Sequence, residues 1–225
     1  MVMQMTSEDH AKVSAAIAAA EKTTDGEILA ITTPLSDPYH DVALHWAVAV
    51  LIGVLAWAAW RPDWLLWWFD LFFGGWRAEP TTSELLTFLM LLAVLKFTVV
   101  LLALKWMPLR LLLTPGGTKT RRVRRRAVQL FKAAAERRTV GRTGILIYLS
   151  MGEHRAEIVG DAAITAVTTP ETWGEAMASL LADVRAGRPA DGIAAAVQQI
   201  GIVLAEHFPK SDANPNEIPD KLIEL

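Results

Sequence analysis

The sequence predicts an α/β domain, with helices flanking a mixed β-sheet, that is interrupted by a two-helix transmembrane hairpin. Two long apolar segments lie in the first half of the 225 residues, strand-forming runs occur before and after them, and amphipathic helical patterns surround these runs. The hydrophobic content of 52% and the mean hydropathy of +0.30 exceed those of an ordinary soluble domain. Part of the chain is therefore expected to lie in lipid.

Composition excludes several classes of function. The net charge of -2 gives no overall attraction to nucleic acid, so any electrostatic partner must be recognised by a local cluster. The absence of cysteine excludes disulfides, thiolate zinc sites and cysteine nucleophiles. The first forty residues contain Glu8, Asp9, Glu21 and Asp25, and they lack the basic head and apolar stretch of a cleavable signal peptide. We therefore expect the N-terminus to stay inside the cell.

The two apolar segments are the predicted spans. Val42 to Trp60 contains His45 as its one ionisable group, and at about 1.5 Å per residue it nearly crosses a hydrocarbon core of about 30 Å. Leu85 to Met107 is the second span, with Lys96 at its middle and Lys105 near its end. Two spans form a hairpin that covers residues 41–107.

The loop between the spans is rich in aromatic residues, with tryptophans and phenylalanines on both sides of Asp70. Such rings prefer the headgroup zone, and the apolar run is too short to cross a bilayer. We expect a short helix along the membrane surface, and interfacial anchoring explains these rings better than a ligand-binding aromatic box.

Positive charge predicts the orientation of the hairpin. The loop holds Arg61 and Arg77, whereas a basic run follows the second span. The positive-inside rule then places both termini and the soluble domain in the cytoplasm, at a bacterial inner membrane. The same run favours contact with anionic lipid headgroups over nucleic acid. Its arginines are Arg121, Arg122, Arg124, Arg125 and Arg126.

Lys96 leaves an alternative open. A charge at middle depth in a membrane is costly and often functional. A small transporter or channel would follow if hairpins assembled into a homo-oligomer around Lys96, but neither span contains an acidic partner for it. A lysine can also extend toward the membrane surface.

The soluble domain is expected from residues 1–40 and 119–208. Thr6 or Ser7 caps an alanine-rich helix that ends near Thr24, and "GEILAITTPLS" follows as the first strand. Residues 121–138 form a helix whose apolar stripe includes Val123, Ala127 and Phe131. "ILIYLS" is a strand buried on both faces, and "EHRAEIVG" returns after a Met-Gly turn. Two amphipathic helices follow, and residues 209–225 are an extended tail rich in proline and asparagine.

Four stretches resemble the TPM domain family, in its bacterial membrane-associated branch. They are "AEKTTDGEILAIT" at residues 20–32, "RTGILIYLSMGEHRAEIVGD" at 142–161, Trp173 with "GRPADGIAAAVQQIG" at 187–201, and the tail from His207. The resemblance implies a mixed sheet between helices, often tethered to a membrane. It implies no single function, because its members include weak acid phosphatases, photosystem maintenance factors, receptor modulators and calcium-binding proteins.

The ionisable cluster at residues 153–157 has two interpretations. Strand alternation sends Glu153, Arg155 and Glu157 to one face, where two carboxylates and an arginine form a self-neutralising ladder. Alternatively, acidic residues gather at neighbouring strand ends and bind Ca²⁺ or Mg²⁺ through oxygen ligands. The candidate ligands are Asp25, Glu27, Glu153 and Asp161, with Arg142 and Arg155 as contacts for a phosphate or a partner.

The function favoured by the sequence is a non-catalytic, membrane-tethered interaction or envelope-maintenance module. Its expected partners are membrane lipids and an unidentified membrane or cytoplasmic protein. The alternative is a weak, divalent-metal-dependent acid phosphatase, in which the cation would hold a phosphate and activate water. The sequence has no Asp-x-Asp run, paired metal histidines or glycine-rich phosphate loop that would support this alternative. Whether the protein is an enzyme is left open by these patterns.

Overall fold

The structure is a computed structural model that describes residues 5–74, 80–134, 143–211 and 218–225. The chain forms two compact units. The sheet unit consists of Met1–Asp37 and Gly116–Leu225, and the helical unit is Pro38–Pro115. The helical unit is thus inserted into the sheet unit after its first strand.

Within the described residues, the sheet has four strands in the order β3-β2-β1-β4. They are β1 (Glu27–Thr33), β2 (Gly144–Ser150), β3 (Arg155–Gly160) and β4 (Leu222–Glu224). The strands β2 and β4 run parallel to β1, and β3 runs antiparallel to β2. This confirms the predicted mixed sheet. Because β1 and β2 are parallel, their carboxyl ends lie at the same end of the sheet.

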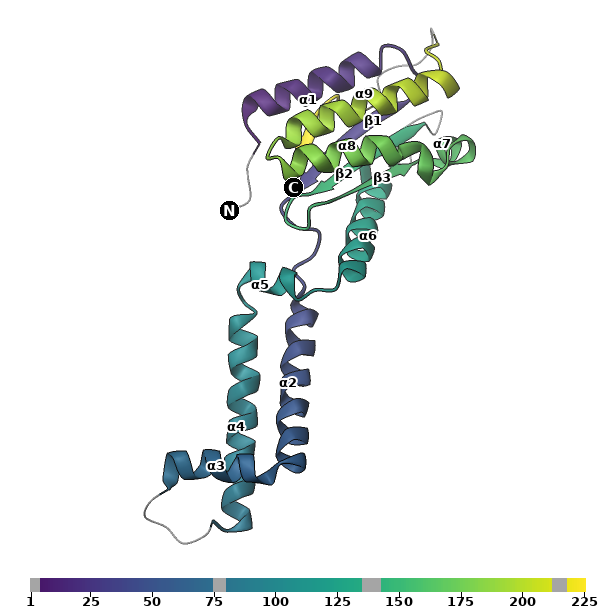
Figure 1. Ribbon diagram of the computed structural model, residues 1–225. Coiled ribbons are helices and arrows are strands. Elements are labelled where there is room, and N and C mark those ends of the chain that lie inside the picture. The colour runs from purple at the N-terminus through teal and green to yellow at the C-terminus, as the bar shows by residue number, and fades with distance from the viewer. Residues whose placement is uncertain (1–4, 75–79, 135–142, 212–217) are drawn as a thin grey trace. The chain divides into compact units, whose positions relative to one another are not determined.

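Helices cover both faces of the sheet (Figure 1). One face carries α1 (Ser7–Ala20), α8 (Gly174–Arg185) and α9 (Pro189–His207), and the other carries α6 (Gly116–Ala134). Successive strand side chains point to opposite faces, so Ile28 and Ile147 join the core under α1, α8 and α9, whereas Leu29 and Leu146 join the core under α6. Burial on both faces explains the continuous apolar run of β2, all seven residues of which are buried.

Local signals set the ends of several elements. Thr6 accepts a hydrogen bond from the backbone N–H of Asp9 (3.2 Å), and the Asp9 carboxylate accepts one from the N–H of Thr6 (2.8 Å). This capping box begins α1 where the sequence predicts it. The helix α6 begins at Gly116, before the predicted start at Arg121, and its end is described as far as Ala134.

The 3-10 helix η1 (Pro170–Trp173) forms the first turn that the sequence predicts for the helix that ends near Gly187. Two short helices and one strand were not expected from the sequence, and they are α5 (Met107–Leu112), α7 (Ala162–Val167) and β4. The last of these lies in the segment predicted to be an extended tail. There, Leu222 pairs with Ala30 and is buried, so this part of the tail belongs to the sheet and its core.

The helical unit contains α2 (His40–Trp60), α3 (Pro62–Phe73), α4 (Thr82–Ala103) and α5. Two of these helices, α2 and α4, are long and apolar enough to cross a membrane. The helix α4 stops short of the predicted Met107, because Leu104 ends it before α5 begins. Large apolar side chains of both helices are exposed, for example Ile52 at 58% and Leu91 at 59%. These surfaces are apolar enough to require cover.

Two cations of the helical unit have defined contacts. Arg110 is buried and donates from Nε to the Leu104 carbonyl and from Nη1 to the Pro38 carbonyl, each at 2.7 Å. It therefore joins the two chain ends of this unit. Lys96 lies with Nζ 6.0 Å from the ring centroid of Trp68, a cation–π contact. Trp68 belongs to α3, so the aromatic segment supplies a partner for this lysine.

A candidate anion-binding pocket

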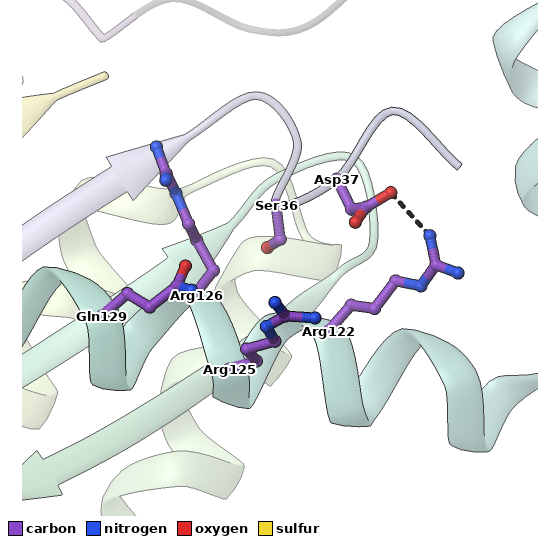
Figure 2. Close-up of a pocket in the computed structure, with 6 residues that line it drawn as sticks. All are labelled: Ser36, Asp37, Arg122, Arg125, Arg126 and Gln129. Carbon is purple, nitrogen blue, oxygen red and sulfur yellow. Dashed lines mark hydrogen bonds and ion pairs between the residues drawn. The ribbon is translucent and has the colours of Figure 1, made fainter. Parts of the chain in front are cut away.

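A pocket of about 250 Å³ lies at the carboxyl end of β1, between the loop that follows this strand and α6. The loop contributes Ser36 and Asp37, and α6 contributes three arginines and a glutamine (Figure 2). These four residues of α6 are Arg122, Arg125, Arg126 and Gln129. The carboxyl ends of parallel strands are a common place for ligand sites in α/β folds.

The spacing of α6 explains how three arginines reach one pocket. Arg122 is followed by lining residues at positions i+3, i+4 and i+7, which share one face of a helix. The buried residues Val123, Ala127 and Phe131 form a separate stripe that packs against the sheet. Packing of this apolar stripe fixes the rotation of α6 and turns the arginine stripe toward the loop after β1.

Partly buried hydrogen bonds hold Ser36 at the edge of the pocket. The Ser36 N–H donates to both carboxylate oxygens of Glu153 (3.0 and 3.2 Å), and Glu153 also accepts from the Ser150 hydroxyl. The Ser36 hydroxyl and the Tyr148 phenol are 2.8 Å apart, and the phenol is equally close to the Thr33 hydroxyl. The loop is therefore anchored to both parallel strands.

The β2–β3 turn fixes the same loop from the other side. The N–H groups of Met151 and Gly152 donate to the carbonyls of Thr33 and Pro34, each at 2.9 Å. A Cβ atom at Gly152 would lie 2.7 Å from the Pro34 carbonyl oxygen, so this close approach requires glycine. The position of Ser36 thus depends on contacts between segments far apart in the sequence.

The pocket is electropositive and partly open. The lining residues carry three guanidinium groups and one carboxylate, that of Asp37. Arg122 donates to this carboxylate at 2.6 Å. Burial raises the pKa of Tyr148 above its ordinary value, although the hydrogen bonds from Ser36 and Thr33 oppose this shift. The phenol beside Ser36 is therefore neutral at physiological pH. Guanidinium groups and a hydroxyl are suited to bind a phosphate or carboxylate group.

Three of the predicted acidic ligands lie at the opposite, amino end of the sheet, and each accepts a backbone hydrogen bond. Asp25 accepts from Ser211 (2.9 Å) and Glu27 from Ile218 (3.2 Å). Asp161 caps α7 and accepts from the adjacent N–H of Ala162 (2.6 Å). These carboxylates tie the C-terminal segment and α7 to the end of the sheet.

The structure does not bring Glu153 to this group. Glu27 pairs with Gly144 at the start of β2, whereas Glu153 follows the end of that strand. Seven strand residues separate the two ends, a distance of about 20 Å. The expected gathering of all four carboxylates is thus corrected: Glu153 supports the Ser36 loop, and it is buried in the turn instead of continuing the ladder on β3. Among the described residues, no group of three or more His, Asp or Glu side chains is placed to hold a metal ion. Binding of Ca²⁺ or Mg²⁺ stays a prediction.

The predicted basic contacts are divided among different surfaces. Arg122, Arg125 and Arg126 line the pocket, while Arg124 lies on another side of α6 beside Glu157. Arg121 interacts with Thr118 on its own helix, at 3.5 Å. Arg155 donates to Thr120 (2.7 Å) and is not among the pocket residues, and Arg142 lies outside the described part of the chain.

Ser36, Asp37, Tyr148 and Gln129 were missed by sequence reasoning. A signal for Ser36 exists in "TTPLSDP", where Ser36 and Asp37 come three and four positions after the end of a buried strand. Gln129 continues the helical spacing that starts at Arg122. Tyr148 has no comparable signal, because its position within an apolar strand indicates only a core residue.

The fold and the pocket define an α/β domain with a mixed sheet and an arginine-lined pocket at one sheet end. The sequence model of the family described as TPM domain matches residues 112–203, which include α6, β2, β3, α7, α8 and most of α9. The chain contains a TPM domain. It is also similar to the NMR structure of BA42 protein from the psychrophilic bacterium Bizionia argentinensis, at 16% sequence identity and a TM-score of 0.56. This similarity covers 99% of the present chain and 97% of the other, and at such low identity it concerns the fold alone. No curated protein matches the sequence.

Proposed function

We propose that this protein is a membrane-anchored, non-catalytic binding module at the bacterial inner membrane, with its TPM domain in the cytoplasm. In this proposal, Arg122, Arg125 and Arg126 bind a phosphate group, carried either by a lipid headgroup or by a soluble molecule. The grouping of these arginines with Ser36 around one pocket is the observation that carries the proposal. A homo-oligomer built through the hairpin remains compatible with it.

Connectivity supports a role at the membrane. Asp37 is the last residue before the helical unit, and α6 begins at the first residue after it. Ser36 and Asp37 therefore adjoin the first junction in sequence, and the pocket residues of α6 begin six positions after Gly116, at Arg122. The exposed apolar side chains of α2 and α4 would be covered by lipid.

The chemistry of the pocket favours binding over turnover. A serine nucleophile requires an adjacent base that accepts its proton. Ser36 instead contacts the Tyr148 phenol, whose pKa is raised by burial and which cannot take that proton at neutral pH. Glu153 contacts the backbone N–H of Ser36, and its carboxylate is occupied in holding the loop.

The binding site can be tested with the full chain in detergent micelles. The triple variant Arg122→Gln, Arg125→Gln and Arg126→Gln removes the pocket charges, and the matched control Lys119→Gln, Arg121→Gln and Arg124→Gln removes the same charge from the rest of α6. Inorganic phosphate and short-chain phosphatidic acid are the two probes, with thermal unfolding as the readout. A probe at 100 times its Kd stabilises a protein by about 2.7 kcal/mol.

We expect the wild type and the control to be stabilised and the pocket variant to show no shift. Stabilisation by the lipid alone indicates a headgroup site, whereas stabilisation by both probes indicates a general phosphate site. Equal shifts in all three proteins would contradict the proposal. Hydrolysis of a phosphate ester that disappears in Glu153→Ala or Asp161→Ala would favour the phosphatase alternative instead.

The absence of cysteine makes the orientation directly testable. Thr82→Cys, at the start of α4, and Ser211→Cys, after α9, each introduce one thiol at an exposed position. In spheroplasts, an impermeant maleimide should label Cys at position 82 from outside and label position 211 only after lysis. The reverse pattern would place the TPM domain outside the cytoplasm.

A further inference from the structure

A second concave surface lies along β3, which is an edge strand of the sheet. It is a slot of about 450 Å³ whose base is formed by residues 157–160. One wall comes from α6, with Arg124 and Val128, and the other comes from η1 and α8, with Trp173 and Met177. Elements on both faces of the sheet therefore line the space beside this edge, where another strand would lie, and α7 lines it as well.

The backbone of β3 has the hydrogen-bonding pattern that pairing with such a strand requires. The N–H of Asp161 donates to the carbonyl of Gly144 at 2.9 Å, which makes these residues a hydrogen-bonded pair of the antiparallel ladder. Bonded and non-bonded pairs alternate in such ladders. The backbone N–H and C=O groups of Ala156, Ile158 and Gly160 therefore point away from β2, and within the described chain none of them bonds to a further backbone group.

The opposite edge of the sheet is different. The edge strand β4 has only three residues, and its Glu224 side chain accepts from the Met5 N–H (3.2 Å) and lies 3.5 Å from His10. Short edge strands covered by other segments are protected from pairing. The strand β3 has six residues and keeps a slot beside it.

The two walls of the slot differ in chemistry. Facing α6, the Glu157 carboxylate lies near the guanidinium groups of Arg124 and Arg155, so two positive charges oppose one negative charge. Facing α8, the exposed surfaces of Ile158, Trp173 and Met177 are apolar. Successive side chains of an added strand alternate between these two walls.

We propose that the β3 edge binds an extended segment of a partner protein in which acidic and apolar residues alternate. The segment pairs with the outward backbone groups of β3, places its acidic side chains against Arg124 and its apolar side chains against Trp173. This mode is β-strand addition, in which backbone hydrogen bonds give affinity and the alternating side chains give specificity. The inference goes beyond the anion-binding function and uses a different face of α6.

A capped, fluorescently labelled peptide of about eight residues that alternates Glu and Val is the probe, since strands of this length are ordinary. Its anisotropy is measured against the full chain in micelles, with empty micelles subtracted. A peptide of the same composition with the four Glu residues grouped together tests the alternation. We expect the alternating peptide to bind at least ten-fold more tightly than the grouped peptide.

Charge reversal locates the site. Arg124→Glu should weaken binding of the Glu–Val peptide at least ten-fold and create binding of a Lys–Val peptide. The control Arg125→Glu makes the same change one residue away, on the side of α6 that lines the anion pocket, and should leave both peptides unaffected. Both positions are exposed, and near-equal melting temperatures would show that the folds of the two variants are intact.

Backbone pairing is tested by N-methylation, which removes a hydrogen-bond donor. Two versions of the Glu–Val peptide carry N-methyl groups on alternate residues, one version at the even positions and the other at the odd positions. Strand addition predicts that only one version binds, because only one set of N–H groups faces β3. Equal binding of both versions, or equal effects of Arg124→Glu and Arg125→Glu, would overturn the proposal without bearing on the phosphate pocket.

Discussion

At the amino end of β1 and β2, carboxylates are buried against backbone N–H groups, whereas at the carboxyl end guanidinium groups surround an open pocket. Glu21 and Glu27 illustrate the first arrangement, since they accept from the N–H groups of Ile28 (2.8 Å) and Ile218 (3.2 Å) and both are buried. Arg122, Arg125 and Arg126 illustrate the second. The carboxylates at the amino end fix chain segments, whereas the guanidinium groups at the carboxyl end line a pocket with room for a ligand.

Glu153 shows that position along the sheet determines what a carboxylate does. It lies at the basic end, yet it does not face the pocket as a ligand group, and its oxygens bind the Ser36 N–H and the Ser150 hydroxyl. An acidic side chain exposed in the pocket would oppose anion binding, and one buried beneath the loop supports it. The role of a carboxylate at either end of the sheet therefore depends on its hydrogen-bond partners as well as on its negative charge.

The largest effect is expected from Glu153→Ala. The variant leaves the N–H of Ser36 without its acceptor and creates a cavity, which together should cost about 3 kcal/mol in the free energy of unfolding. It should also abolish phosphate-induced stabilisation, because Ser36 loses its position. Chemical denaturation in micelles measures the first effect, with Glu153→Gln as a control that keeps the volume and an acceptor. A variant that melts like the wild type would show that the carboxylate does not hold the loop.

A smaller effect, dependent on pH, is expected from Glu21→Gln. Burial, assisted by the negative charges of Glu27 and Asp220, raises the pKa of Glu21 to about 8 from 4.5. The unfolded chain loses this proton near pH 4.5 and the folded chain retains it, so stability falls as pH rises from about 4.5 to 8. The fall is limited to about 1.4 kcal/mol per pH unit.

The Gln variant is neutral at every pH and retains an oxygen that can accept from Ile28. Its free energy of unfolding relative to wild type should therefore rise by about 2 kcal/mol between pH 6 and pH 8. Glu157, whose pKa is raised by burial, is present in both proteins and cancels in the comparison. Parallel stability curves for the two proteins would show that Glu21 ionises normally in the fold.

Much of the architecture could be predicted because it is encoded locally. Three features depend only on residues that are close together in the sequence: the apolar run of β2, the capping box at Thr6, and the helical stripe of Val123, Ala127 and Phe131. The strand β4 could not be predicted in this way. It has three residues, and it exists because Leu222 pairs with Ala30, far away in the sequence.

The site was only partly predictable for the same reason. The cluster of arginines is visible in the sequence. Which arginines line the pocket and which line the β3 slot depends on how α6 is rotated about its axis against the sheet. The grouping of Glu153 with Glu27 failed because nothing local specifies that β1 and β2 pair in parallel. Parallel pairing places the first residue of one strand and a residue beyond the end of the other at opposite ends of the sheet.

The smallest effect is expected from Asp161→Ala, at the acidic end. Its carboxylate caps α7, so its loss should cost about 1 kcal/mol, and Asp161→Asn should recover most of this because asparagine is also a good cap. Phosphate-induced stabilisation should be unchanged in both variants, since Asp161 lies at the other end of the sheet from Ser36. Thermal unfolding with and without inorganic phosphate measures both quantities. Loss of the phosphate effect in Asp161→Ala would show that the two ends act as one site, and it would remove the distinction between a structural acidic end and a ligand-binding basic end.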